Sequence, residues 1–126
     1  MNTTTIPARQ LIRLLADTAA AQPADLAAVE LLARHNHFLH LPAFRRLITT
    51  GNSAFTGEPV ATIRWKAAIT ALDTGRLPST SSERAVLRIA ASLGDHHIPV
   101  HLARVLGSLD HTNITLVTTA ITRANG

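Results

Sequence analysis

The sequence contains no cysteine and no tyrosine, and three phenylalanines and one tryptophan are its only other aromatic residues besides histidine. Without cysteine the chain has no disulfide, no thiolate metal site and no thiol nucleophile. With so few rings its core must be aliphatic. A stacking platform for single-stranded nucleic acid is not expected, because such a platform needs several exposed rings.

Lysine and long apolar runs are also scarce. Lys66 is the sole lysine, so arginine supplies nearly all of the positive charge, and the formal net charge is +4. We interpret the arginine and alanine bias as a high-GC coding background. A mildly positive surface favours anionic partners without identifying one. No apolar run approaches the roughly 20 residues that cross a bilayer.

We expect no secretory signal at the beginning of the given sequence, because it lacks a continuous apolar stretch and a leading basic cluster. Arg9 and Arg13, with no acidic residue before Asp17, superficially match a transit peptide. An ordinary first helix explains the same residues, and we expect a cytoplasmic protein.

The 126 residues suffice for one compact domain. The apolar fraction of 46% and the charged fraction of 16% exclude wholesale disorder. Strand signals are nearly absent, since no period-two alternation stands out and no Asn-Gly turn joins two candidate strands. The sequence therefore predicts an all-α fold, a single compact bundle of six or seven short helices that spans residues 1–126.

Prolines and glycines divide the chain into helices. Residues 1–5 are predicted to be a flexible tail, and residues 6–75 to hold four N-terminal helices. In the short third of these, Arg45 and Arg46 are expected to face solvent. The predicted helices run from Pro7 to about Ala21, from Ala24 to Phe38, from Pro42 to Gly51 and from Glu58 to Asp73.

A C-terminal three-helix unit is predicted over residues 79–126. Thr80 and Glu83 have the spacing of a capping box at the start of its first helix, which Gly94 ends. Asp110 caps the last helix, whose many threonines are mediocre helix formers, so packing must hold it in place. The middle helix, 100–106, is apolar on almost every side, and we expect it to be central to the packing.

Residues 100–123 also resemble a helix-turn-helix in one respect. Ala103 and Gly107 have the spacing at which a small residue lets two helices cross and a glycine permits the turn. The apolar positions that follow Gly107 lie one residue later than the helix-turn-helix pattern places them, so the turn would need one inserted residue. A plain three-helix packing unit explains the same pattern, and we prefer it because short matches recur by chance.

If residues 100–123 bind DNA, we expect two kinds of contact, to phosphates and to base edges. Arginines supply phosphate contacts, and polar side chains of the last helix contact base edges. The candidate residues are Arg84, Arg88, Arg104, Asn113, Thr115 and Arg123.

The histidines form two groups, His35, His37 and His40, and then His96, His97 and His101, with His111 apart. Helical metal-ligand spacing requires that the helix persists to Leu41 in the first group and passes Pro99 in the second. Asp95 would join the second group only through loop geometry. Exposed histidines in loops and at helix ends are the ordinary explanation, so we expect no metal and no other cofactor.

Catalytic motifs are missing. The chain has no G-x-S-x-G elbow, no P-loop and no G-x-G-x-x-G. Its carboxylates are scattered singly, and helix capping or the helix dipole explains Asp25, Glu83 and Asp110. We expect that the protein is not an enzyme and has no small-molecule substrate.

One resemblance is carried by the C-terminal unit. The unit contains the segments Ser82-Glu83-Arg84, Leu87-Arg88-Ile89-Ala90-Ala91-Ser92-Leu93, Leu109-Asp110, Asn113 and Leu116-Val117. Together these segments resemble a block in small helical proteins of high-GC actinobacteria. A looser likeness extends over residues 31–47. The resemblance implies a bacterial, cytoplasmic setting. It implies no functional residue, because the matching positions are caps and core residues.

The sequence thus leads to two hypotheses. The first is a non-enzymatic interaction module that contacts another protein and self-associates, because a short chain with such an apolar helix leaves surface for a two-fold dimer to bury. The alternative is a DNA-binding transcriptional regulator that uses residues 100–123. A single exposed face holding Arg84, Arg88, Arg104 and Arg123 would favour nucleic acid.

Overall fold

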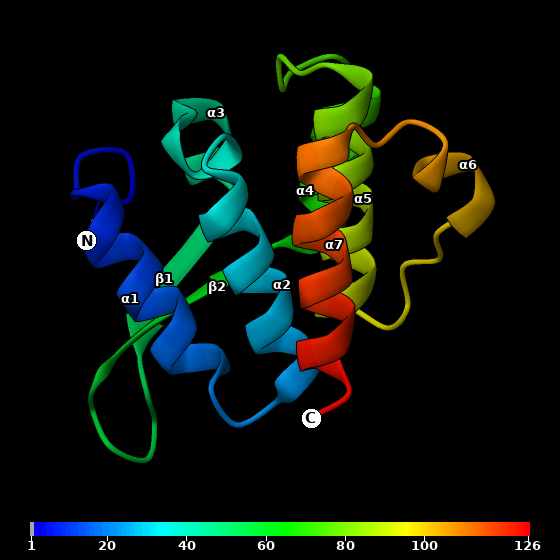
Figure 1. Ribbon diagram of the computed structural model, residues 1–126. Helices are drawn as coiled ribbons and strands as arrows, with labels where there is room; N and C mark the ends of the chain where they lie inside the picture. The colour runs from blue at the N-terminus through cyan, green and yellow to red at the C-terminus, as the bar shows by residue number, and fades with distance from the viewer. Residues whose placement is uncertain (1) are drawn as a thin grey trace.

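In the computed structural model, which describes residues 2–126, the chain folds mainly into helices with one two-stranded sheet (Figure 1). The described residues form seven α-helices, a 3-10 turn at Phe38–His40 and two strands. In chain order they are α1 (Ala8–Ala19), α2 (Pro23–His35), α3 (Pro42–Arg45), β1 (Ile48–Asn52), β2 (Pro59–Ile63), α4 (Trp65–Asp73), α5 (Ser81–Gly94), α6 (Leu102–Leu106) and α7 (His111–Ala124).

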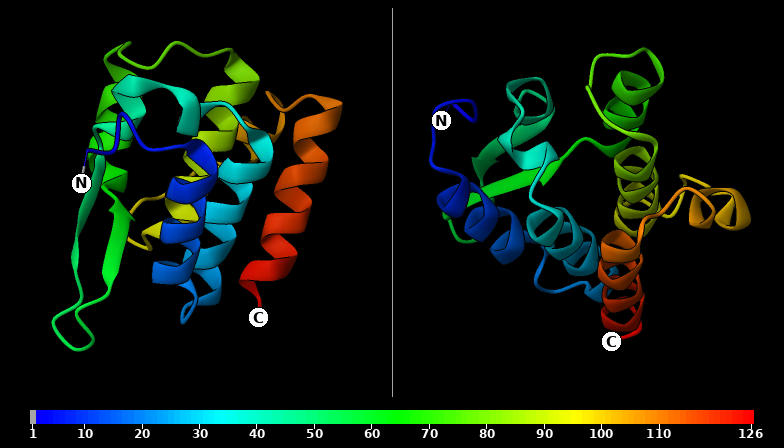
Figure 2. Two further views of the ribbon diagram at one scale, coloured as in Figure 1. Left: turned by 90° about the vertical axis from the view of Figure 1, so that its left-hand side faces the viewer. Right: turned by 45° about the horizontal axis from the view of Figure 1, so that its top comes forward.

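The expectation of an all-α fold is wrong in one place, the hairpin of β1 and β2. The two strands pair antiparallel, from Ile48 opposite Ile63 to Asn52 opposite Pro59. Two predicted helices are shortened by it, since α3 stops at Arg45 and α4 begins only at Trp65. The loop between the strands projects beyond the helices (Figure 2, left).

The residues of the hairpin explain why it is a sheet. Isoleucine, valine and threonine occupy most of its positions, and their branched side chains favour strands over helices. Ile48, Ala61 and Ile63 are buried, and β2 packs against α1. The N–H of Ala61 donates to the hydroxyl of Thr18 on α1 at 3.0 Å, so the helix satisfies an edge group of the strand.

The centre of the molecule is α2, which packs against α1, α5 and α7. Its buried residues cover most of its circumference: Ala27, Ala28, Val29, Leu31 and Leu32. The expectation that residues 100–106 lie centrally is wrong. Helix α6 packs against α5 through Val105, and it stands out from the other helices (Figure 1; Figure 2, right).

Both predicted caps of the C-terminal unit are confirmed. The N–H of Thr80 donates to Glu83 Oε1 at 2.7 Å, and the N–H of Glu83 donates to Thr80 Oγ1 at 3.2 Å. Asp110 Oδ1 accepts from the N–H of Asn113 at 2.8 Å. Four threonine hydroxyls of α7 donate to the carbonyl four residues earlier, which satisfies these side chains within the helix.

Residues 2–5 are held in place, in contrast to the flexible tail predicted for residues 1–5, of which Met1 lies outside the described residues. Thr3 is buried, and its hydroxyl donates to the carbonyl of Arg45 at 2.7 Å. Arg45 is only 8% exposed and does not face solvent as expected. Its guanidinium donates to the carbonyls of Leu39 at 2.7 Å and Ile6 at 2.6 Å, which joins the chain start to the segment before α3.

Among the described residues, no helix combines the length and apolar character that crossing a bilayer requires.

Candidate functional site

Three of the six candidate DNA-contacting residues come together. Arg84, Arg88 and Arg104 line one depression of about 150 Å³ between α5 and α6. Arg88 Nη2 donates to Asp73 Oδ1 at 2.5 Å, so part of its charge is neutralised. Among the described residues Arg84 and Arg104 have no ion-pair partner. The depression is therefore a small cationic surface.

The other three candidates lie apart from this surface. Asn113 is 6% exposed, and its Nδ2 donates to Ser82 Oγ at 2.9 Å, so it joins α7 to α5 from inside. Thr115 donates its hydroxyl to the carbonyl of His111 within α7. Arg123 Nε donates to Glu30 Oε1 on α2 at 2.7 Å. The four arginines thus do not share one face.

The helix-turn-helix pairing is also not formed in the expected way. Helix α6 packs on α5, whereas α7 packs on α2 and α5. A helix-turn-helix needs its two helices packed against each other across the turn. Gly107 has a right-handed helical backbone with φ of −65°, a conformation that any residue can adopt, so the turn does not require a glycine at this position.

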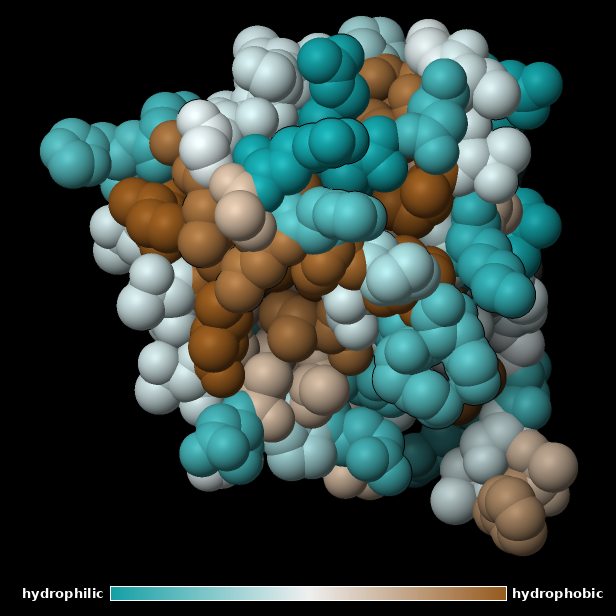
Figure 3. All heavy atoms as spheres, turned by 90° about the vertical axis from the view of Figure 1, so that its right-hand side faces the viewer, coloured by the Kyte–Doolittle hydropathy of each residue, from teal (hydrophilic) through white to brown (hydrophobic). Residues whose placement is uncertain are grey.

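Apolar side chains gather on the face that α5, α6 and α7 form (Figure 3). Leu102 and Leu106, one turn apart on α6, are 50% and 38% exposed. Between them in sequence, Val105 is buried and anchors α6 to the core. We call Leu102 and Leu106 the α6 leucines.

The first histidine group does not converge on one point. His37 Nδ1 lies 3.4 Å from Glu83 Oε2, and its Nε2 lies 3.0 Å from the carbonyl of Pro78. His40 Nε2 lies 2.5 Å from Asn36 Oδ1. The Nδ1 of His35 is buried without a hydrogen-bond partner among the described residues.

The surroundings of His35 disfavour its protonated form. Burial lowers the pKa of its imidazole from 6.5, and the neighbouring His37 lowers it further, against the opposite effect of Glu83 and Asp110.

The second group forms a different set from the expected one. Asp95, His96 and His97 place ligand atoms within 4.8 Å of one another, and His101 is not part of the set. Asp95 Oδ1 accepts from the His97 N–H at 2.9 Å, and this hydrogen bond holds the pKa of the carboxyl below its usual value. Loop geometry after α5 assembles these three residues, which are the described residues able to share a metal ion.

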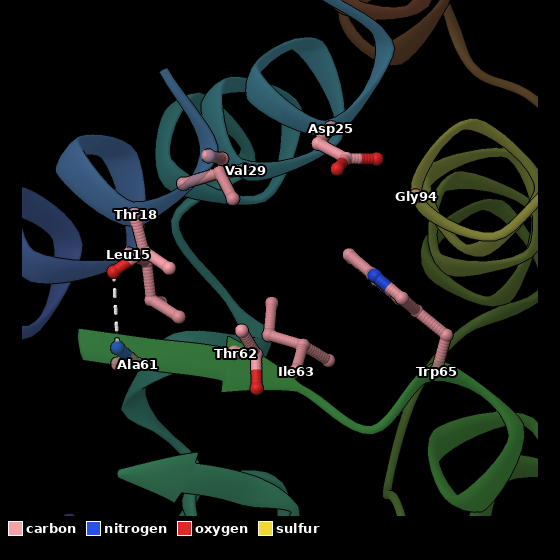
Figure 4. Close-up of a pocket in the computed structure, with 10 residues that line it drawn as sticks. Leu15, Thr18, Asp25, Val29, Ala61, Thr62, Ile63, Trp65 and Gly94 are labelled. Carbon is pink, nitrogen blue, oxygen red and sulfur yellow. Dashed lines mark hydrogen bonds between the residues drawn. The ribbon is translucent and has the colours of Figure 1, made fainter. Parts of the chain in front are cut away.

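A pocket that sequence reasoning missed lies between α1, α2, β2 and the start of α4 (Figure 4). It has a volume of about 160 Å³. Asp25 and Trp65 both extend into it from different elements. Its walls are Leu15, Thr18, Ala19, Asp25, Val29, Ala61, Thr62, Ile63, Trp65 and Gly94.

Nothing in the local sequence brings Asp25 and Trp65 together. Asp25 fits the first turn of α2, and Trp65 fits the apolar stripe of α4, so each has a complete local explanation. The sequence held no signal for this pocket: the single tryptophan is half-buried, and its degree of burial is not readable from spacing.

The chain matches no family model, no curated protein and no solved structure. The resemblance to actinobacterial helical proteins therefore stays a prediction. What the fold defines is the class of small helix-dominated domains with one hairpin.

Proposed function

We propose that the protein is a non-enzymatic interaction module of the bacterial cytoplasm that self-associates through the α6 leucines. The observation that carries the proposal is the exposure of Leu102 and Leu106 on a helix that stands out from the other helices. Large apolar side chains grouped on one face mark surfaces that another molecule covers.

A second copy of the chain is the partner we propose. The α6 leucines lie one turn apart, so a two-fold axis beside α6 would bring each leucine against a leucine of the other copy. Arg84 and Arg104 line a separate depression that contains neither leucine, so the proposed interface buries neither of these charges. Both halves of such an interface come from one exposed helix, so dimer formation would leave the core undisturbed.

Sedimentation velocity over a concentration series tests this proposal. We expect the sedimentation coefficient of the wild type to rise with concentration, and the double variant Leu102→Glu, Leu106→Glu to remain monomeric. Both positions are exposed, so the variant is expected to fold, which circular dichroism checks.

The matched control is Phe55→Ser. Phe55 is 99% exposed at the tip of the hairpin and lies outside α6, so its replacement should leave the concentration dependence unchanged. A wild type that remains monomeric at every concentration contradicts the proposal.

The alternative is a DNA-binding regulator, which the cationic depression favours. Contact would run from Arg84 and Arg104 to phosphates, without the Asn113 and Arg123 contacts of the helix-turn-helix hypothesis. In a salt series on duplex binding, each phosphate contact contributes about 0.9 to the slope of log K against log salt. The variant Arg84→Ala, Arg104→Ala should therefore lower the slope by about 1.8. Arg9→Ala, Arg13→Ala on α1 is the control, and equal slopes in both variants reject this surface.

A further inference from the structure

The pocket of Figure 4 contains one charged side chain in otherwise uncharged surroundings. Asp25 is the sole titratable residue among those that line it. Among the described residues, no hydrogen bond and no ion pair engages its carboxylate. Burial raises the pKa of Asp25 above 3.8, which reflects the cost of an unpartnered charge beside apolar walls.

The opposite wall is the indole of Trp65, which is fixed in place. One side of the ring lies directly against Gly94, at the end of α5, where a Cβ atom would overlap the ring. The space left beside it is bounded by aliphatic side chains, among them Val29 and Ile63. An indole held in this way offers a rigid, electron-rich surface next to a carboxylate.

The charge of the pocket selects the ligand class. A carboxylate repels anions, and an indole face attracts cations through its quadrupole, most strongly where water is excluded. Hydrated metal ions are poorly matched, because the pocket offers one carboxylate and few other oxygen ligands. An organic cation combines a positive charge with apolar substituents, which suits both the carboxylate and the aliphatic walls.

The size of the pocket selects among organic cations. Its volume of about 160 Å³ is close to that of an engineered cavity of about 150 Å³ that binds benzene. The ligand is therefore of about benzene's size, as a quaternary ammonium with short substituents is.

We propose that the pocket between α1, α2, β2 and α4 binds a small alkylammonium ion, with the carboxylate of Asp25 as counter-ion and the indole of Trp65 as the cation-binding surface. This site is separate from the α6 leucines, so the proposal is independent of self-association.

The first experiment uses Trp65 as the reporter, because it is the only tryptophan of the chain. Choline is titrated at constant ionic strength while tryptophan emission is recorded. The comparison ligand is 3,3-dimethylbutan-1-ol, in which a carbon replaces the charged nitrogen. We expect a saturating change with choline and at least tenfold weaker binding of the alcohol. No saturation with choline, or equal affinity for both ligands, overturns the proposal.

The second experiment removes the charge with Asp25→Asn. Choline affinity should fall at least tenfold, while affinity for the alcohol should not change. The control is Asp17→Asn, an exposed carboxylate on α1 next to the lining residue Thr18, which should alter choline affinity less than twofold. Equal choline affinity in Asp25→Asn and the wild type overturns the assignment of the counter-ion.

A pH series on the wild type keeps the proposal testable if Asp25→Asn does not fold. The other lining residues from α1, β2, α4 and α5 are uncharged. The charged residues next to them in sequence are Asp17, Arg64, Lys66 and Asp95, and none of these lines the pocket. Choline affinity should fall tenfold per pH unit below the raised pKa of Asp25, and affinity for the alcohol should stay constant. A choline affinity that is independent of pH through this range overturns the proposal.

Discussion

The hydroxyl of Thr3 donates to the carbonyl of Arg45 at 2.7 Å, and Arg45 Nη1 donates back to the carbonyl of Thr3 at 3.4 Å. This reciprocal pair joins residues 42 positions apart and holds Thr3 against the end of α3. Burial of an arginine is tolerated here because its donors are satisfied by backbone carbonyls.

Arg45→Met should therefore destabilise the fold strongly. Methionine retains much of the apolar stem, but the carbonyls of Leu39 and Ile6 lose their donors while they remain enclosed. We expect the free energy of unfolding in urea to fall by about 3 kcal/mol. Arg46→Met is the control, because Arg46 is exposed, and its effect should stay within about 0.5 kcal/mol. Equal effects of the two variants would contradict the role of Arg45.

Gly94→Ala tests the contact between Gly94 and Trp65. Alanine is the better helix former by about 1 kcal/mol, and the glycine does not have a positive φ. The new methyl group would nevertheless overlap the indole. We expect a net loss of about 1–3 kcal/mol of stability together with a shift of tryptophan emission.

Gly107→Ala is the matched control for that substitution. A Cβ at Gly107 would lie no closer than 3.6 Å to its nearest neighbour, the carbonyl oxygen of Arg104. Its stability should be unchanged or slightly higher. A Gly94→Ala protein as stable as Gly107→Ala would show that the indole can move without cost, and the rigid wall of the pocket would then be refuted.

Ser82→Ala should loosen the contact between α5 and α7. Ser82 Oγ accepts from the N–H of Asp110 at 3.0 Å and from Asn113 Nδ2 at 2.9 Å. Alanine leaves both donors without this acceptor, and the amide of Asn113 is buried. We expect a loss of about 1–3 kcal/mol in urea unfolding. Ser81→Ala at the neighbouring exposed position should have a far smaller effect, and the opposite order would contradict this interpretation.

The stability of the protein should fall as the pH is lowered from about 6.5, because His35 has a lowered pKa in the folded state. The unfolded chain binds a proton near its ordinary pKa of 6.5, whereas the folded chain binds it only at a lower pH. Between these two values the unfolded state holds more protons, so acidification favours unfolding.

His35→Gln should flatten this dependence. Urea unfolding measured at a series of pH values below 7 checks the slope of stability against pH. His111→Gln, at an exposed position, is expected to retain the wild-type slope. If His35→Gln retains it as well, the pH dependence does not arise from His35.

The sequence by itself determined the hydrogen bonds whose donor and acceptor lie only a few residues apart along the chain. Thr80 and Glu83 satisfy each other's backbone groups within one helical turn, and Asp110 reaches the N–H of Asn113 in the same way. Such local hydrogen bonds are readable from spacing, and the helical C-terminal unit followed from them. The hairpin was not predicted from the sequence, because each strand is only five residues long and the loop between the strands lacks a two-residue turn motif.

Only the tertiary structure decided which side chains are available to act. Arg45 and Asn113 are polar residues with surface-like patterns, yet groups distant in sequence bury them. The residues of α6 are mostly apolar, as in a helix of a protein core, but Val105 is the only one of them that is buried. Asp25 and Trp65 line one pocket because the tertiary structure brings α2 and the start of α4 to the same cavity. Burial depends on the total surface that all elements compete to cover, and no local pattern contains that information.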